Sequence, residues 1–537
     1  MKFNWHNPYP STRTPVFARN IVSTSQPLAA QAGLAVLRAG GNAVDAAIAA
    51  AATLTLVEPC SNGLGSDNFA IVWDGHKLHG LNSSGTAPAA WTLDWFRSRH
   101  GKDAGRRPQR GWDTVTVPGA VAGWAALHEK LGKLAFADVL APAIEYAERG
   151  FAVSPVVAEK WHLAAPLLKD QPGFAAAFLP HGRAPEVGEH FVLRGAARTL
   201  KSIAASKGES FYRGEIAHAI AKYAQETGGA ITEADLAAYR PEWVGTIQQE
   251  FMGHELHEIP PNGQGLAALM ALGILKHSPC GHCKVDTADW YHVGLEAMKL
   301  AFADVYAHVA DARHMRMTTA ELLDDAYLAA RARLIDMKHA QVFGPGKLAT
   351  GGTVYLTTAD ERGMMVSLIQ SNYMGFGSGV VVPGWGISLQ NRGHGFALDD
   401  AHPNALAPGK RPFHTIIPAF LTRHGMPQMS FGVMGGNMQP QGHVQTLIRM
   451  LCAHQQPQAA CDAPRWKWME GLKVEVEASM PREAREELAR RGHELVVGRD
   501  SYMDFGAGQF IWRLGEPGIQ GYVAASDPRR DGAAAGY

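Results

Sequence analysis

The sequence predicts a protein of the α/β class, in the α+β sense, in which a largely helical part precedes a strand-rich part. Apolar residues recur with helical spacing over residues 26–56, and residues 120–340 are mostly helical in pattern between proline and glycine breaks. Beyond residue 353, short apolar runs alternate with turn residues, which is typical of strands. A chain of 537 residues is also long enough to bury a large core.

The first helical region divides into two helices. Gly40-Gly41 ends the first helix, and Asn42 caps the second, which is rich in alanine. Residues 44–57 form the most apolar stretch, of about 14 residues, whereas a membrane-spanning helix needs about 20. We therefore expect a buried helix here and no membrane partner.

Strands are expected on both sides of the long helical part. Residues 69–73 form an apolar run that ends at Asp74-Gly75. Residues 354–358 and 364–371 flank the turn at 360–363 and predict a hairpin. The other expected elements are strands at residues 379–382, 386–389, 415–421 and 429–433 and a helix at 441–452.

The charge and the N-terminus exclude several classes of partner. Fifty basic and fifty acidic side chains give no net charge, which argues against binding nucleic acid or an anionic membrane. Residues 1–15 are polar and proline-rich and contain no apolar segment of a secretory signal, so we expect a cytoplasmic protein.

Neither a disulfide framework nor a metal site is expected. Five cysteines are an odd number and are widely spread. Cys280-Gly281-His282-Cys283 has half the spacing of a zinc site, but no second Cys-x-x-Cys completes it. His254 and His257 are three residues apart, not the four of a zinc-protease helix, and Pro260-Pro261 follows them. We expect no metal and no cofactor.

Gly351-Gly352-Thr353 opens the strand-rich part of the chain. A break between Gly352 and Thr353 would give the threonine a free amine, whose pKa of about 7.7 to 8.0 lets it act as a base for the hydroxyl. Threonine with its own amine is a known activated nucleophile. Residues 341–352 carry four glycines and a proline, which indicates a mobile loop. Taken alone, the tripeptide also fits an ordinary loop before a strand.

Six longer motifs occur in order along nearly the whole chain. They are VSTSQPLA at 22–29, GGNAVDAAIA at 40–49, VPGAVAG at 117–123, SNYMGFGSG at 371–379, GVMGG at 432–436 and DPRRDG at 527–532. Together they resemble the γ-glutamyltranspeptidase family of N-terminal nucleophile hydrolases.

The resemblance implies a precursor that cuts itself before Thr353. Residues 1–352 would form a large subunit and residues 353–537 a small one, and the two would build a four-layer αββα sandwich jointly. Thr353 would then form the acyl-enzyme. Gly352 stands where relatives often have aspartate, which leaves the efficiency of cleavage open. An unprocessed, inactive binding protein is the alternative of another class.

Further catalytic roles follow from the same resemblance. Gly435 and Gly436 match positions whose backbone N–H groups form an oxyanion hole, and a plain glycine turn between strand and helix is the alternative. Ser371 matches a hydroxyl that orients the nucleophile, and Asn372 or Tyr373 matches a nearby polar contact. Each of these could instead be a solvent-facing strand residue.

The substrate-binding residues depart from the family. The stretch 82–88 lacks the arginine that holds a glutamyl carboxylate in relatives, and His394 lies where an acidic pair would hold the ammonium. Arg392 is a substitute that could bind a carboxylate, unless it pairs with Asp399 or Asp400. Further polar candidates are His394, His414 and Thr415.

The sequence thus predicts a self-processing threonine amidohydrolase that acts on a small carboxylate-bearing amide. Oxamate hydrolysis, known in one branch of the family, is the specific case that we favour. A γ-glutamyltransferase or glutathione hydrolase is the second choice and a glutaryl-cephalosporin-type acylase the third. The sequence does not decide whether the acyl group is transferred to water or to an amine. It also leaves the oligomeric state open, and a homo-oligomer of the two-subunit unit is one alternative.

Overall fold

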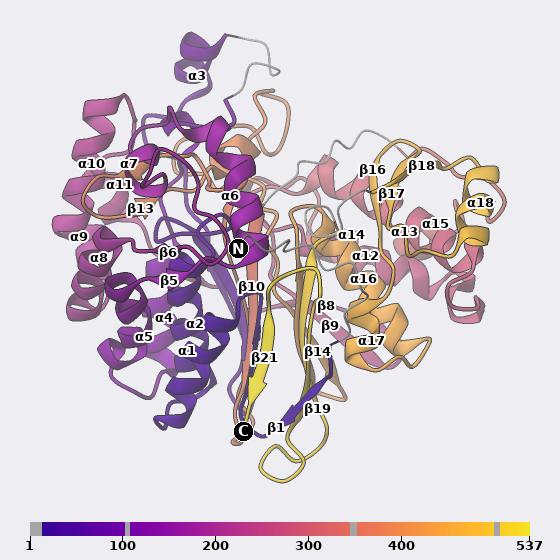
Figure 1. The fold of residues 1–537 in the computed structure, drawn as a ribbon. Coiled ribbons are helices and arrows are strands. Elements are labelled where there is room, and N and C mark those ends of the chain that lie inside the picture. The colour runs from indigo at the N-terminus through magenta and orange to yellow at the C-terminus, as the bar shows by residue number, and fades with distance from the viewer. Residues whose placement is uncertain (1–12, 102–107, 344–351, 499–504) are drawn as a thin grey trace.

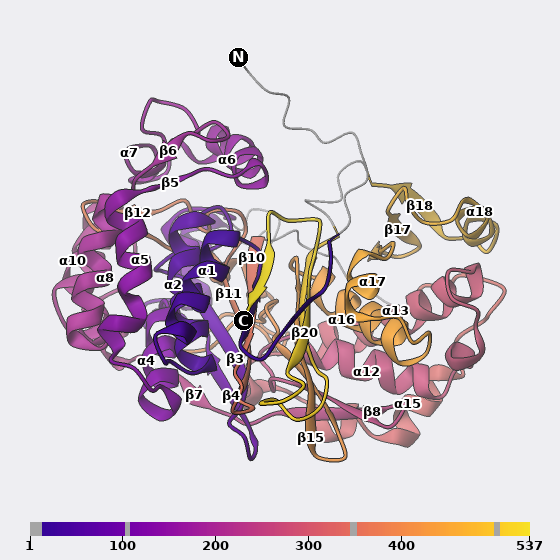
Figure 2. The same cartoon turned by 60° about the horizontal axis from the view of Figure 1, so that its bottom comes forward.

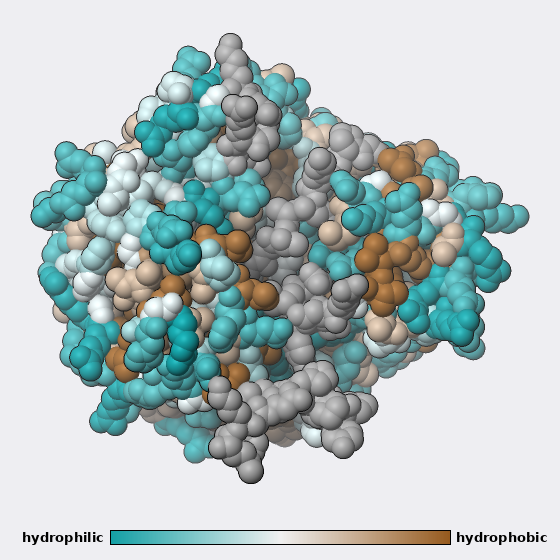
Figure 3. Space-filling model, turned by 45° about the horizontal axis from the view of Figure 1, so that its top comes forward, coloured by the Kyte–Doolittle hydropathy of each residue, from teal (hydrophilic) through white to brown (hydrophobic). Residues whose placement is uncertain are grey.

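The computed structural model describes residues 13–101, 108–343, 352–498 and 505–537. These residues form two large β-sheets that stack face to face, with helices on both outer sides (Figure 1, Figure 2). Within the described ranges, no helix combines the length and apolar character needed to cross a bilayer. In the view of Figure 3 the described surface is mostly hydrophilic, and the apolar residues form separate groups.

The first seven-stranded sheet contains the predicted hairpin and is antiparallel throughout. It draws strands from both sides of the expected cleavage site, so neither part of the chain could form it alone. In spatial order its strands are β21 (Ala533–Gly536), β2 (Ile21–Thr24), β10 (Gly352–Ala359), β11 (Met365–Tyr373), β3 (Asp67–Trp73), β4 (Leu78–Ser83) and β7 (Glu242–Trp243).

The second seven-stranded sheet is likewise shared between the two parts of the chain. Apolar side chains such as Phe69, Tyr355, Phe420 and Ile511 pack between the two sheets and belong to one buried cluster. In spatial order the strands are β1 (Val16–Ala18), β20 (Tyr522–Ser526), β19 (Ala507–Arg513), β15 (Met426–Met434), β14 (Ala419–Arg423), β9 (His254–Glu258) and β8 (Ile247–Phe251).

Alanine-rich helices cover the first sheet. α2 (Ala43–Val57) is buried along its whole length, as its composition predicts. Asn42 caps it: the Asn42 side chain accepts from the Asp45 N–H, and the Asp45 side chain accepts from the Asn42 N–H. The other helices of this half are α1 (Pro27–Arg38), α4 (Ala120–Leu131), α5 (Phe136–Arg149), α6 (Pro155–Leu168), α7 (Phe174–Phe178), α8 (Arg194–Ser206), α9 (Glu209–Arg213), α10 (Glu215–Thr227) and α11 (Glu233–Ala238).

A second set of helices covers the other sheet. Their apolar faces form one buried cluster with strands β14 and β15. The set consists of α12 (Gly265–Lys276), α13 (Ala288–His308), α14 (Thr319–Leu322), α15 (Asp325–Ala332), α16 (Met438–Leu451), α17 (Pro457–Asp462) and α18 (Arg482–Arg490). The αββα architecture expected from the resemblance is confirmed.

Smaller elements complete the described residues. A separate helix, α3 (Leu93–His100), packs Phe96 against a small aromatic cluster. Short sheets pair β5 (Phe151–Ala152) with β6 (His190–Phe191), β12 (Val381–Val382) with β13 (Ile387–Ser388), and β17 (Lys473–Val476) with both β16 (Trp466–Glu470) and β18 (Glu494–Val497).

Residues 120–340 are mostly helical, as their pattern predicts, and the short strands β5 to β9 lie between the helices. One expectation from the sequence needs correction. The strand expected at 415–421 begins only at Ala419. His254 and His257 lie on β9, which agrees with the rejection of a zinc-binding helix. Most of the loop expected at 341–352 lies outside the described residues.

Candidate active site

Thr353 lies on β10 at an irregularity in its pairing with β11. Gly352 pairs with Tyr373, whereas Val354 already pairs with Gln370, so one extra residue of β11 faces Thr353. The Thr353 side chain is buried, and its Oγ1 donates to the Ser371 Oγ at 3.2 Å. The predicted nucleophile and its predicted orienting hydroxyl are therefore in contact.

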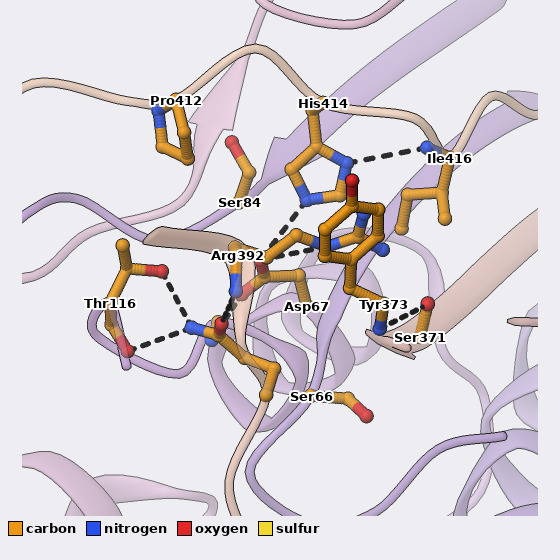
Figure 4. Close-up of polar contacts among 12 residues, drawn as sticks. Ser66, Asp67, Ser84, Thr116, Ser371, Tyr373, Arg392, Pro412, His414 and Ile416 are labelled. Atoms are coloured by element: carbon orange, nitrogen blue, oxygen red, sulfur yellow. Dashed lines mark hydrogen bonds and ion pairs between the residues drawn. The ribbon is translucent and has the colours of Figure 1, made fainter. Parts of the chain in front are cut away.

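Tyr373 continues this contact chain. Its backbone N–H donates to the Ser371 Oγ at 2.7 Å. Its φ of +77° is uncommon for a residue with a side chain and is typical of positions that the surrounding structure holds in place. Figure 4 shows the Tyr373 ring beside Arg392 and His414.

Arg392 lies at the start of the short 3-10 helix η5 (Arg392–Gly395) and is buried. Its NH1 donates to the Thr415 Oγ1 at 2.8 Å, and its Cζ lies 4.7 Å from the centroid of the Tyr373 ring. Within the described ranges, its Nε and NH2 atoms have no hydrogen-bond partner. Two donors of a buried guanidinium are thus left for a ligand.

The carboxylate that faces Arg392 is Asp67. The Arg392 Nε and the Asp67 Oδ2 are 3.9 Å apart, too far for a hydrogen bond but close enough for attraction. Among the described contacts, the pairing with Asp399 or Asp400 that the sequence left open is not found, since Asp400 pairs with Arg97 at 2.9 Å. Asp67 starts β3, directly opposite Ser371 of β11.

His414 binds the same carboxylate from the other side. Its Nε2 lies 3.0 Å from the Asp67 Oδ2, and its Nδ1 accepts from the Ile416 N–H at 3.4 Å (Figure 4). Because Nδ1 accepts, the proton of a neutral ring is on Nε2, which donates to Asp67. All three side chains of the Asp67, Arg392 and His414 group are buried.

Burial dominates the electrostatics of this group. It raises the pKa of Asp67 to about 7, against the opposing charge of Arg392. It lowers the pKa of Arg392 to about 10, against the opposing charge of Asp67. Burial, with the repulsion of Arg392, holds the pKa of His414 well below its usual value, so His414 is neutral.

Gly435 and Gly436 form the turn between β15 and α16. Their φ angles of +130° and +60° lie in the region that favours glycine. Within the described ranges neither of their N–H groups donates a hydrogen bond, as an oxyanion hole requires. The Gln264 side chain connects this turn to the arginine: its Nε2 donates to the carbonyls of Gly436 and Thr415.

The remaining candidates differ in where their side chains lie. His394 contacts the Pro108 carbonyl at 3.0 Å and faces the Tyr373 ring at 6.4 Å between centroids. The Asn372 amide instead bonds to Ser66 at 2.7 Å and Ser388 at 3.2 Å. The structure therefore groups His394 with Tyr373 and Arg392 and directs the Asn372 side chain to the neighbouring loops.

One group of potential metal ligands occurs among the described residues. His292, Glu296 and His493 are buried and close together. The Lys299 ammonium, however, donates to the Glu296 carboxylate at 2.7 Å and neutralises it. The ion pair explains the buried charge without a metal.

Sequence reasoning missed Asp67 and Gln264. Asp67 is a single charged residue at the start of an apolar strand, which was the one visible sign of a special role. Gln264 carries no such sign, because a glutamine after Pro260-Pro261 reads as part of a loop.

Comparison with known proteins identifies the family. The model of the family described as "Gamma-glutamyltranspeptidase" matches residues 29–537. The chain belongs to the gamma-glutamyltranspeptidase family. It is therefore an enzyme, a proenzyme amidohydrolase of this family, and its proenzyme relatives imply a precursor cleaved into two subunits.

Three members of the gamma-glutamyltranspeptidase family illustrate the similarity. The glutathione hydrolase-like YwrD proenzyme of Bacillus subtilis is 36% identical and is matched over 96% of this chain and 98% of its own length. The oxamate amidohydrolase proenzyme of Klebsiella pneumoniae is 37% identical over 95% of this chain and 97% of its own. The crystal structure of a cephalosporin acylase from Bacillus halodurans has a TM-score of 0.94 and 49% identity, covering 100% of this chain and 99% of that one.

Proposed function

We propose that the protein cuts itself between Gly352 and Thr353 and then hydrolyses a small amide whose acyl group carries a carboxylate. The two subunits would be residues 1–352 and 353–537. The Thr353 amine takes the hydroxyl proton, and the hydroxyl oxygen attacks the amide carbonyl to form an ester with loss of the amine. Water then attacks this acyl-enzyme and releases the acid.

Three groups would assist Thr353. Ser371 orients the hydroxyl through the 3.2 Å contact. The N–H groups of Gly435 and Gly436 stabilise the negative charge that develops on the carbonyl oxygen, and losing one such donor typically costs about 10²- to 10³-fold in kcat.

The burial of Arg392, together with its two donor atoms that have no hydrogen-bond partner among the described residues, supports a carboxylate on the substrate. A buried guanidinium with two free donors is costly unless an anion pairs with it. Asp67 at 3.9 Å compensates the charge only partly, and Thr415 occupies only NH1. A substrate carboxylate that accepts from Nε and NH2 would complete the site in the two-bond geometry that arginine favours.

We take oxamate as the preferred substrate, because one carboxylate adjacent to one amide matches one arginine and one nucleophile. A relative is named an oxamate amidohydrolase. γ-Glutamyl substrates are less favoured, because the stretch 82–88 lacks the arginine that holds a glutamyl carboxylate in relatives. The polar side chains of this stretch are already paired: Ser84 donates to Asn82, and Asn82 donates to Asn262. The 49% identity to a cephalosporin acylase supports a larger amide as the second candidate.

A series of monoamides that differ only in length tests the substrate. Ammonia release is measured from oxamate, malonamate, succinamate and glutaramate, and p-nitroaniline release from γ-glutamyl-p-nitroanilide. We expect the highest kcat/KM with oxamate. Turnover of the γ-glutamyl compound with none of the four monoamides would contradict the proposal, whereas a maximum at glutaramate would favour the acylase candidate.

The buried Asp67 makes substrate binding depend on pH. Below about pH 7 the raised pKa keeps the Asp67 carboxyl neutral, so Arg392 presents a full positive charge to an anionic substrate. We expect the KM for oxamate to rise as the pH increases from 6 to 8, on the order of tenfold for each 1.4 kcal/mol of lost attraction.

The Asp67→Asn variant is the control for this prediction. It has no titrating carboxyl beside Arg392, so we expect its KM to stay constant over the same pH range. kcat should still increase with pH in both proteins, because the Thr353 amine must lose its proton. An equal rise of KM in Asp67→Asn would assign the pH dependence to another group.

A further inference from the structure

Gln264 connects the two halves of the candidate site. Its side chain is buried, and both hydrogens of its amide are used: Nε2 donates to the Gly436 carbonyl at 2.9 Å and to the Thr415 carbonyl. Thr415 in turn accepts from Arg392. The Gln264 side chain thus links the turn at 435–436 to Thr415, the residue that binds Arg392.

The backbone around Gln264 fixes this side chain in place. Gln264 precedes α12, and its own N–H donates to the His414 carbonyl at 2.9 Å. The neighbouring Asn262 accepts from the His414 N–H at 3.0 Å, and its side chain donates to the Pro412 carbonyl at 2.8 Å. Residues 262–264 therefore run along the loop at 412–415 and cannot shift without it.

The glycine turn needs such an external anchor. Glycine has wide freedom of φ and ψ, so Gly435 and Gly436 do not by themselves fix the direction of their N–H groups. Holding the Gly436 carbonyl fixes the peptide plane that follows Gly436. Together with the turn bonds from Met438 to Gly435 and from Gln439 to Gly436, this sets the conformation of the turn.

We infer that Gln264 is a positioning residue that sets the distance between the carboxylate site and the oxyanion site, and so selects substrates by length. This inference rests on the proposed function, in which Arg392 binds the carboxylate and Gly435 and Gly436 bind the oxyanion. A substrate fits when its carboxylate and its scissile carbonyl are separated by the distance that this bridge maintains. Gln264 precedes the expected cleavage site and both of its carbonyl partners follow it, so the bridge joins the two subunits.

Gln264→Met tests the inference, because it keeps the length of the side chain and removes both donors. The readout is the ratio of kcat/KM for the best monoamide to kcat/KM for the monoamide one methylene longer, with rates normalised to the fraction of cleaved chains. A loss of general stability lowers both rates in proportion and leaves the ratio unchanged. We expect the ratio to fall at least about fivefold and kcat to fall on the order of 10²-fold, as for a displacement of about 1 Å in a catalytic group.

Gln445→Met is the matched control. Gln445 is also buried and also donates both amide hydrogens to backbone carbonyls, those of Gln441 and Trp466. We expect this variant to keep the wild-type ratio within about twofold, since neither carbonyl belongs to the site. Gln264→Glu, which also removes the donors, should reproduce the effect of Gln264→Met if the methionine variant fails to fold.

Two outcomes would overturn the inference. An unchanged ratio in Gln264→Met or Gln264→Glu is one, and an equal fall in Gln445→Met is the other. If the wild-type enzyme cleaves γ-glutamyl-p-nitroanilide but none of the monoamides, the proposed substrate is wrong. The inference is then tested separately, by the same ratio for the γ-glutamyl compound and its β-aspartyl analogue, which is one methylene shorter.

Discussion

Thr353→Ala leaves the chain at its full mass of 57.8 kDa and without measurable ammonia release from oxamate. The substitution removes the hydroxyl that attacks the Gly352 carbonyl in the precursor and the substrate carbonyl in the mature enzyme. Denaturing electrophoresis detects the first effect and an ammonia assay the second. Thr353→Ser retains a hydroxyl and is expected to be cut and active, at reduced rates.

Thr358→Ala is the matched control for this experiment. Thr358 is another buried threonine of β10, and its hydroxyl donates to the Ala43 carbonyl. Its loss removes a buried hydrogen bond at a net cost of about 1 kcal/mol and should leave cleavage intact. Cleavage of Thr353→Ala at the same bond would show that another residue is the nucleophile.

Arg392→Gln is the second substitution with a large expected effect. We expect kcat/KM for oxamate to fall about 10²- to 10³-fold, because breaking a buried, hydrogen-bonded charge pair costs about 2 to 5 kcal/mol. Most of the change should lie in KM, since Arg392 binds the carboxylate and not the reacting carbonyl. Cleavage of the precursor should persist, because the precursor supplies no such carboxylate.

Arg411→Gln separates this role from a general effect of removing a buried arginine. Arg411 is buried on the neighbouring loop, but it is occupied by the Glu242 carboxylate at 2.7 Å and the Ser84 carbonyl at 3.1 Å. We expect its loss to change KM for oxamate by no more than about threefold, because its hydrogen-bond partners differ from those of Arg392 and its charge acts on Asp67 less strongly than that of Arg392. Unchanged oxamate turnover in Arg392→Gln would show that Arg392 does not bind the substrate carboxylate.

Local signals in the sequence predict several elements of the fold well. Gly40-Gly41 and Asn42 mark the boundary between α1 and α2, and the turn at 360–363 marks the hairpin of β10 and β11. Such signals do not predict the two large sheets, because their pairings join distant segments: the hairpin of β8 and β9 is local, but β9 pairs with β14, which lies about 160 residues further along the chain. Only the family resemblance predicts their stacking, since pairing between distant strands leaves no local pattern.

In the candidate site, too, residues in local motifs are predictable from the sequence, whereas contacts between distant strands are not. Thr353 and Ser371 are recognisable because they lie in motifs on adjoining strands, and the structure brings their hydroxyls into contact. Arg392 is recognisable as an unusual charge, but its partner is not: sequence proximity suggests Asp399 or Asp400, whereas the fold places Asp67 of β3 beside it. A salt-bridge partner from a distant strand is set by topology, which composition and spacing do not encode.

Intact-mass spectrometry of the purified wild-type chain under denaturing conditions tests the central claim most directly. Cleavage before Thr353 predicts two masses, those of residues 1–352 and 353–537, with the smaller fragment starting at the sequence TVYLT. A single mass of 57.8 kDa after prolonged incubation, or a fragment that starts at any residue other than Thr353, would contradict it.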